Sequence, residues 1–408
     1  MKSVRGSICA VVVLGLAVAA TPLAAAAHGR GPGHGHGHGP RTWTVRSGQS
    51  IQAAIDAASP GDTVNVFPGD YVESPSSSVA VHVTKPLKLV AKKGERPSWR
   101  KVRILAAPGQ RNGILAEPAN AGDPDLDGLL IKGFIVEGFE NNGIWLRHVK
   151  NFTIEENESV NNLENGIFPT LSANGLVKRN VAYGSQDSAL WVEASENVRV
   201  VQNDLHHSPT GLEITISNEV MVEENDIHHN TIGVGFYHPA TAGLPQEQWP
   251  SYWDGGNWHL VGNYVHDNNE PNTGEEGSET SQLPSGGGIL LLGVHDIDVN
   301  ANHVANNDFF GIAMVDYCIA TFDTPFNCID NPPPAPTSVR YVPVVGNTLV
   351  NNHGAPPPGP FQPIASDIVE LQTDWTAYGT NCFADNQIIN PPSNPPLTIP
   401  DPLTPICE

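Results

Sequence analysis

A glycine followed by an aliphatic residue recurs along this chain at a nearly constant interval. The first member of this pair, which is once an alanine, is found at Gly143, Gly166, Ala189, Gly211 and Gly233. The intervals are 23, 23, 22 and 22 residues. A column of asparagines keeps the same interval, with members at Asn157, Asn180, Asn203 and Asn225. Two columns that repeat together indicate an internal repeat, and a short period in β-rich sequence is typical of a solenoid.

Within each repeat, short runs alternate between apolar and polar residues, which is the periodicity of β-strands. The residues expected to point inward include Leu212, Ile214, Val220, Val222 and Ile227. The leucine-rich horseshoe is the main alternative solenoid, but its Leu-x-x-Leu-x-Leu signature is missing. The pattern therefore favours a parallel β-helix with three strands per coil, in which coils stack about 4.8 Å apart. Asparagine suits the bends because it tolerates left-handed backbone and can hydrogen-bond to the next coil.

The amino-terminal part of the repeat region predicts a cap. Ser50 can cap a short helix over residues 51–58, and a strand is predicted to follow at 63–67. The segments Gln52-Ala-Ala-Ile-Asp-Ala-Ala and Gly61-Asp-Thr-Val-x-Val-x-Pro-Gly-x-Tyr resemble the cap of the pectin-lyase-like superfamily. This resemblance implies an all-β, right-handed parallel β-helix solenoid with a short N-terminal capping helix. It specifies a fold better than an activity.

The amino-terminal sequence predicts that the chain is exported. Residues 1–27 have a basic start, an apolar run and small residues at the end, which is typical of a cleaved secretory signal; an uncleaved anchor is the alternative. Residues 28–40 form a Gly/His-rich flexible leader. Residues 41–408 are predicted to be a single β-helix domain with an insertion at 239–287 and a loop-rich C-terminal part. After signal cleavage we expect no membrane insertion, and a secreted monomer.

The number of cysteines predicts disulfide bonds. Four cysteines remain after the signal, and an even number in an exported chain predicts two disulfides. Cys318 with Cys328 and Cys382 with Cys407 is the preferred of three possible pairings.

The net charge is −22, and losing Lys2 and Arg5 with the signal lowers it by two, to −24. Such an acidic chain repels nucleic acid.

The residues that follow each glycine predict a binding surface. The second residue after the glycine is Trp145, Phe168 and Trp191 on three successive coils. Stacking would place three aromatic rings in a row on the outer surface, where flat faces are suited to sugar rings. Coverage by the insertion or the tail is the alternative. The predicted partner is a polysaccharide, with the three aromatic residues as its binding positions.

Two sets of residues could perform catalysis next to this row. Glu193 and Glu213 lie one coil and two residues apart, so their β-carbons would be roughly 8 Å apart, within the range of paired carboxyls in inverting glycosidases. A lyase would instead use Arg147 to neutralise a uronate and Tyr237 and His238 as acid and base. The resemblance to the superfamily brings no catalytic motif across, because the triple-Asp cluster of pectin hydrolases, the Asp-Pro-His motif of alginate epimerases and the Asp-Phe-Ile-Phe-Gly segment of pectin esterases are all absent.

Two further clusters are candidate metal sites. His206 and His228 follow the asparagine column on neighbouring coils and could bind Cu or Zn, with His207, His229, His266 and Asp267 beside them. This column resembles β-helix proteins of periplasmic copper maturation. The alternating carboxylates Asp123, Asp125 and Asp127 resemble the first half of a calcium loop, but Phe134 replaces its closing glutamate, so only a looser Ca²⁺ site is predicted. The histidines of the leader, His28, His34, His36 and His38, are a third candidate.

These observations favour a secreted protein that binds a polysaccharide and degrades it as a hydrolase or a lyase. A non-catalytic β-helix, either handling copper or zinc or serving as a scaffold in the cell envelope, is the alternative. The sequence leaves the glycan and the register across 239–287 open.

Overall fold

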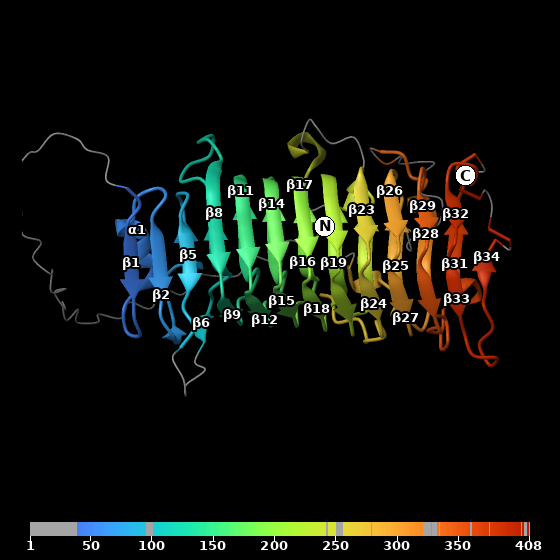
Figure 1. The fold of residues 1–408 in the computed structure, drawn as a ribbon, viewed down its shortest axis with the longest axis horizontal. Helices are drawn as coiled ribbons and strands as arrows, with labels where there is room; N and C mark the ends of the chain where they lie inside the picture. The colour runs from blue at the N-terminus through green and yellow to red at the C-terminus, as the bar shows by residue number, and fades with distance from the viewer. Residues whose placement is uncertain are drawn as a thin grey trace, which may run out of the picture. The chain divides into compact units, whose positions relative to one another are not determined.

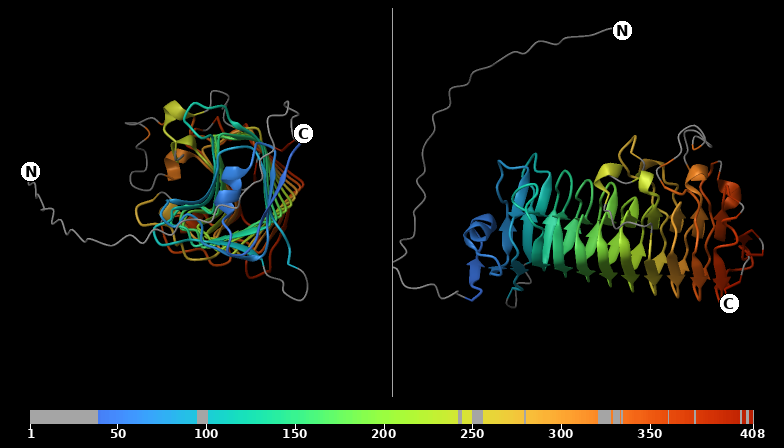
Figure 2. Two further views of the ribbon diagram at one scale, coloured as in Figure 1. Left: turned by 90° about the vertical axis from the view of Figure 1, so that its left-hand side faces the viewer. Right: turned by 90° about the horizontal axis from the view of Figure 1, so that it is seen from above.

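The computed structural model describes residues 39–94, 101–241, 244–249, 256–278, 280–320, 328, 333, 335–359, 361–374, 376–400, 402–403 and 406–407. The predicted signal and nearly all of the leader lie outside these residues. Residues 40–408 form one compact unit, in which the chain winds through coil after coil and corresponding strands of successive coils pair in parallel. Figure 1 shows the coils side by side, and Figure 2 shows them superimposed when viewed along the stack. The predicted parallel β-helix is confirmed.

Three parallel sheets, here called A, B and C, form the walls of this unit. Within the described residues, sheet A contains β1 (Thr42–Val45), β2 (Thr63–Val66), β5 (Lys88–Ala91), β8 (Leu126–Lys132), β11 (Val149–Glu155), β14 (Ala173–Lys178), β17 (Glu196–Val201), β20 (Asn218–Glu223), β23 (Trp258–Val261), β26 (Ile297–Asn300), β29 (Pro343–Val345) and β32 (Cys382–Ala384). Sheet B contains the short strands β3 (Gly69–Tyr71), β6 (Val102–Leu105), β9 (Phe134–Glu137), β12 (Glu158–Val160), β15 (Val181–Tyr183), β18 (Asp204–His206), β21 (Asp226–His228), β24 (Tyr264–His266), β27 (His303–Ala305), β30 (Thr348–Val350) and β33 (Gln387–Ile389). Sheet C contains β4 (Val79–Val83), β7 (Asn112–Ala116), β10 (Ile144–Arg147), β13 (Ile167–Thr170), β16 (Ser188–Glu193), β19 (Thr210–Thr215), β22 (Ile232–Tyr237), β25 (Gly287–Leu292), β28 (Phe310–Val315), β31 (Ser366–Leu371) and β34 (Thr398–Ile399).

The core runs through the inside of the coils. The five side chains predicted to point inward are fully buried, namely Leu212, Ile214, Val220, Val222 and Ile227. Each packs against the equivalent residue of the next coil, since Leu212 is paired with Val234 and Val220 with Trp258. Burial of one aliphatic side chain contributes about 1.5–3 kcal/mol, so the repeated inward positions supply the main driving force for folding.

The asparagine column forms a buried ladder of hydrogen bonds along the stack. Asn203 Nδ2 donates to Asn225 Oδ1 over 2.9 Å, and Asn225 Nδ2 donates to Asn263 Oδ1 over the same distance. The predicted hydrogen bonding is confirmed, but the predicted left-handed backbone is one residue earlier. Gln202 and Glu224, which precede the ladder asparagines, have φ of 55° and 53°. Asparagine is therefore needed here for its side-chain amide and not for its backbone freedom.

The predicted cap helix is α1 (Ile51–Ala57), whose apolar side inserts Ile51 and Ile55 into the core. The Ser50 hydroxyl accepts a hydrogen bond from the Ala53 backbone N–H. Glu73, which the sequence analysis did not single out, accepts from the Ile51 N–H over 2.7 Å and lies at the start of the helix. A carboxylate at this end is favoured by the helix dipole.

The segment 239–287 is two loops around one regular coil, a finer division than the single predicted insertion. The first loop follows β22 and contains η1 (Pro239–Thr241) and η2 (Gln246–Gln248). Strands β23 and β24 then rejoin sheets A and B, and the second loop, with η3 (Thr280–Gln282), leads to β25. His228 is paired with His266, which settles the register that the sequence left open.

The C-terminal part continues the coils to β33 and adds β34 to sheet C. It also contains α2 (Tyr317–Ala320) and η5 (Gln362–Ile364). Both preferred disulfides are confirmed, joining Cys318 to Cys328 and Cys382 to Cys407. Among the described residues, no helix is long and apolar enough to cross a membrane.

Candidate functional site

A pocket of about 520 Å³ lies on the outer face of sheet C. Its floor is made by outward side chains of β16, β19, β22, β25, β28 and β31. Its walls come from both loops of the 239–287 segment, from α2 and the residues after it, and from η5. The lining is largely apolar and aromatic, and its volume is that of a site for a small organic ligand.

The polar groups gather at the end of the pocket formed by β16, β19 and β22. Asp187, in the turn just before β16, accepts a hydrogen bond from the Thr280 hydroxyl over 2.5 Å. Glu213 accepts from the Ser188 hydroxyl over 2.6 Å. The Tyr237 hydroxyl lies 3.3 Å from the Thr210 hydroxyl. Asp187, Glu213, Tyr237 and Thr280 all line the pocket, so two carboxyl groups and a phenol share one partly enclosed space.

Burial raises the pKa of two groups in the pocket, Asp187 and Tyr237. Removal from water raises the pKa of Asp187 to about 6, the nearby Glu164 carboxylate adds to the increase, and the Thr280 hydrogen bond opposes it. Burial, followed by the negative charges of Glu213 and Asp187, raises the pKa of Tyr237 above its usual range. Asp187 is therefore a carboxyl group that changes protonation near pH 6, whereas Tyr237 stays a neutral phenol at physiological pH.

Only one of the two predicted catalytic glutamates reaches the pocket. Glu213 lines it, but Glu193 does not. Glu193 is paired with Thr215 in the next coil, is 2% exposed, and accepts a hydrogen bond from the Thr170 hydroxyl over 3.3 Å. The carboxyl group that shares the pocket with Glu213 is Asp187. Asp187 was not predicted from the sequence, because it precedes Ala189, whereas the predicted site residues follow the glycine or alanine of each repeat.

Trp145, Phe168 and Trp191 are in register as predicted, but the faces of their rings are not open to a ligand. The ring centroids of Trp145 and Phe168 are 6.0 Å apart and those of Phe168 and Trp191 are 4.6 Å apart, with interplanar angles of 6° and 14°. Rings that stack on each other cover their own faces. Phe168 and Trp191 are each only 7% exposed. Of the three, Trp191 alone lines the pocket, with its Nε1 donating to the Thr215 hydroxyl over 2.8 Å.

The three residues of the predicted lyase set are not brought together. Tyr237 is in the pocket, whereas Arg147 and His238 are not among its lining residues. The Arg147 guanidinium lies 5.1 Å from the centroid of the Trp145 ring and donates to Glu117 over 3.4 Å. The His238 ring is fully buried. Its Nδ1 accepts from the Ala240 N–H over 3.0 Å, and its Nε2 lies 3.3 Å from the Ala335 carbonyl oxygen.

The three aspartates of the predicted calcium loop each have a separate partner. Asp123 accepts from Asn120, Asp127 accepts from Asn151, and Asp125 pairs with Lys150 over 2.9 Å. They therefore do not converge on one point.

The predicted histidine column lies at the end of the strands of sheet B. The ring centroids of His206 and His228 are 5.0 Å apart, and those of His228 and His266 are 5.2 Å apart, with the rings nearly parallel. Within the part of the chain that the structure describes, no three His, Cys, Asp or Glu side chains are arranged to hold one metal ion. The histidines of the leader lie outside that part.

Known proteins with related sequence or structure place this chain among β-helices. The family model for the right handed beta helix region matches residues 109–245 and 142–326. The A-module of mannuronan C-5 epimerase AlgE4 from Azotobacter vinelandii has a TM-score of 0.61 and 15% identity, covering 88% of this chain and 95% of the module. DFA-IIIase from Arthrobacter chlorophenolicus A6 without its lid has a TM-score of 0.56 and 13% identity, covering 89% and 92%. At these identities the likeness is one of fold. Comparison with curated protein sequences gave no match.

Proposed function

The chain belongs to the right-handed β-helix family, and from this premise we propose that it binds a carbohydrate in the pocket on sheet C and hydrolyses a glycosidic bond there. Asp187 is the proton donor and Glu213 the carboxylate that assists attack. One observation carries the proposal: two carboxyl groups in different environments lie at the same end of a pocket with aromatic walls. The fold alone does not specify this activity.

The shape and lining of the pocket support a sugar ligand. Its volume of about 520 Å³ is enough for a short segment of an oligosaccharide. Trp191 contributes aromatic surface to the floor, and Tyr317 and Phe361 contribute it to the walls; such surface is suited to the apolar faces of sugar rings. Because the pocket is walled by loops, the bound ligand is the end or a short piece of a chain.

The proposed chemistry gives the two carboxyl groups different roles. Glycoside hydrolysis uses one protonated carboxyl group and one carboxylate. Asp187, with its pKa raised to about 6, holds a proton that it can transfer to the oxygen of the leaving sugar as the bond from carbon to that oxygen breaks. Glu213, held by the Ser188 hydroxyl, either activates the water that adds to the carbon or attacks the carbon itself. The net reaction consumes one water and returns the proton to Asp187.

The test is hydrolysis of a panel of neutral and acidic oligosaccharides and polysaccharides, measured by the release of reducing ends. Removing one acid–base group lowers such rates by about 10²–10⁴-fold, so we expect losses of that size for Asp187→Asn and for Glu213→Gln. Glu193→Gln is the matched control, since Glu193 is a buried glutamate on the neighbouring strand that does not line the pocket.

The pH profile provides a second readout. Because Asp187 must be protonated to act as the acid, activity falls as the pH rises through about 6. Full activity of either pocket variant would reject the assignment. Products that absorb in the ultraviolet would show elimination instead of hydrolysis.

A further inference from the structure

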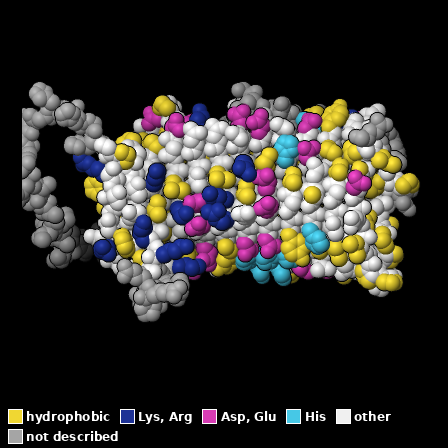
Figure 3. All heavy atoms as spheres, in the orientation of Figure 1, with side chains coloured by type: hydrophobic (Ala, Val, Ile, Leu, Met, Phe, Trp, Pro, Cys, Tyr) yellow, Lys and Arg dark blue, Asp and Glu magenta, His cyan; other side chains and the backbone are white. Residues whose placement is uncertain are grey.

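A cluster of histidine and aspartate side chains on sheet B has no role in the pocket. The last residues of β18, β21 and β24 are His206, His228 and His266, and the register pairs them directly. Each is followed by a residue in left-handed backbone. These following residues are His207, His229 and Asp267, with φ of 55°, 52° and 52°. Figure 3 shows histidine side chains gathered beside acidic ones along one edge of the face in view.

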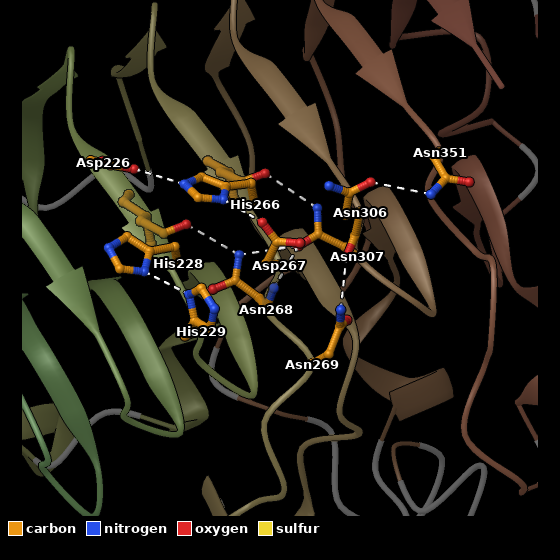
Figure 4. A network of polar contacts seen from close by, with 12 residues as sticks. Asp226, His228, His229, His266, Asp267, Asn268, Asn269, Asn306, Asn307 and Asn351 are labelled. Atoms are coloured by element: carbon orange, nitrogen blue, oxygen red, sulfur yellow. Dashed lines mark hydrogen bonds and ion pairs between the residues drawn. The ribbon is translucent and has the colours of Figure 1, made fainter.

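The close contacts in this cluster lie within each coil. The Nδ1 atoms of His206 and His207 are 2.7 Å apart, and those of His228 and His229 are 2.8 Å apart. On the third coil, His266 Nδ1 lies 2.7 Å from Asp267 Oδ2. We call each of these pairs a rung; Figure 4 shows the second and third. From the sequence, histidines of different coils were expected to share a metal ion. In the structure, the rings of His206, His228 and His266 stack face to face along the coils.

In the second and third rungs, Nε2 of the first histidine is held by a carboxylate of the preceding coil. His228 Nε2 lies 3.1 Å from Asp204 Oδ1, and His266 Nε2 lies 2.9 Å from Asp226 Oδ1. A carboxylate can only accept here, so each Nε2 carries the hydrogen and directs the Nδ1 lone pair into its rung. This is the arrangement by which carboxylates orient metal-binding histidines in proteins.

In the third rung, a single imidazole faces two hydrogen-bond acceptors. His266 meets a carboxylate oxygen at both nitrogens, from Asp226 and from Asp267. Two acceptors on one imidazole require a proton on each nitrogen or a cation in place of one proton. In the first two rungs the two facing Nδ1 atoms are close enough to share one proton, and a cation can take the place of that proton.

We propose that the three rungs bind Cu(II) ions, each through two side chains of one coil. Bonds of about 2.0–2.1 Å at right angles place two ligand atoms about 2.9 Å apart, close to the separations within the rungs. A right angle between nitrogen ligands suits Cu(II), which also has the highest affinity among divalent first-row metals for such ligands. Water or an external ligand completes each coordination shell. The proposal does not depend on the carbohydrate pocket.

The experiment titrates the mature chain with Cu(II), following heat release and the electron paramagnetic resonance spectrum. The leader, residues 28–40, contains His28, His34, His36 and His38, so the parent protein for the test carries alanine at these four positions. The test variant adds His207→Asn, His229→Asn and Asp267→Asn, which removes one ligand from every rung. Asparagine keeps the fold, because Asn306 and Asn351 occupy similar left-handed turns with φ of 54° and 50°.

We expect the parent to bind Cu(II) with a nitrogen-ligand spectrum and the triple variant to lose that binding while keeping its melting temperature. Asp204→Asn leaves all ligands in place and should weaken binding 10–100-fold at the second rung. His259→Asn is the control, since His259 pairs with a carboxylate, Asp298, on sheet A and belongs to no rung. The proposal is overturned if the parent binds no Cu(II) or if the triple variant binds it as tightly as the parent.

Discussion

His238 shows at the scale of one residue how burial decides what an imidazole can do. Its ring is fully buried and stacks on Tyr317, with ring centroids 4.3 Å apart. Burial lowers the pKa of His238 to about 4. A neutral ring that accepts from the Ala240 N–H and reaches the Ala335 carbonyl oxygen joins two loops beside the end of β22. These contacts indicate a structural residue rather than the base of a lyase.

The pKa of His238 predicts a dependence of stability on pH. The folded value of about 4 lies below the value of about 6.5 of an unfolded histidine. The unfolded chain therefore binds more protons between these values, and the contribution of His238 to stability is lost as the pH falls from about 6.5 towards 4. We expect His238→Asn to melt at a lower temperature at pH 8 but to lose less stability on acidification. Thermal melting across this range measures both effects.

The exposed His303 supplies the control for this prediction, because His303→Asn removes a histidine that is not buried. That variant should keep the pH dependence of the parent. An unchanged slope in His238→Asn would show that other groups cause the loss of stability in acid.

The sequence predicted which residues share a column but not how far their side chains are exposed to solvent. The stacking of Trp145, Phe168 and Trp191 follows directly from the repeat, because pairing in register places equivalent residues side by side. The burial of Trp191 in a pocket does not follow from it. The pocket walls include Thr280 and Phe361, which lie far along the chain, and no local pattern specifies where such loops fold back.

At the scale of the strand and the coil, the asparagine ladder supports a strong prediction. Asn225→Ala leaves the backbone N–H and the amide of Asn203 without their acceptor and removes one donor to the Val200 carbonyl oxygen. Each unsatisfied buried group costs about 1–3 kcal/mol. We expect a total loss of about 3 kcal/mol or more in the free energy of unfolding, measured by urea denaturation. Asn120→Ala in an exposed loop is the control, and equal losses in the two variants would contradict a special role for the ladder.

The same elements show where prediction from the sequence stops. Alternation and the period were enough to predict the stacked coils, whereas the cap helix was predicted from Ser50 and from the resemblance of the cap segments. The left-handed position could not be assigned from asparagine content, because the residues that adopt it include Arg179, Gln202 and Glu224, which have little in common. A tight turn held by tertiary contacts on both sides can impose this backbone on most residues at a modest energetic penalty.

At the scale of the whole molecule, the regular stack provides a flat wall and the irregular segments make the site. Sheet C continues through the pocket in the same register as elsewhere, with β25 paired to β28 and β28 to β31. The enclosure comes from segments that follow no repeat. The disulfide between Cys318 and Cys328 restrains one of them, since Cys328 lines the pocket and Cys318 belongs to α2. The other disulfide ties β32 to the end of the chain.

The two disulfides are therefore expected to have separable effects. Replacing Cys318 and Cys328 with serine frees a wall of the pocket, so hydrogen exchange should increase in α2, and loss of a cross-link over 10 residues should lower the free energy of unfolding by about 2–3 kcal/mol. Replacing Cys382 and Cys407 frees the last coil, and a disulfide that closes a loop of this size stabilises a protein by about 3 kcal/mol. The melting temperature should then fall while exchange around the pocket stays as in the parent. If replacing Cys318 and Cys328 left exchange in α2 unchanged, the Cys318–Cys328 bond would not be what holds the wall in place.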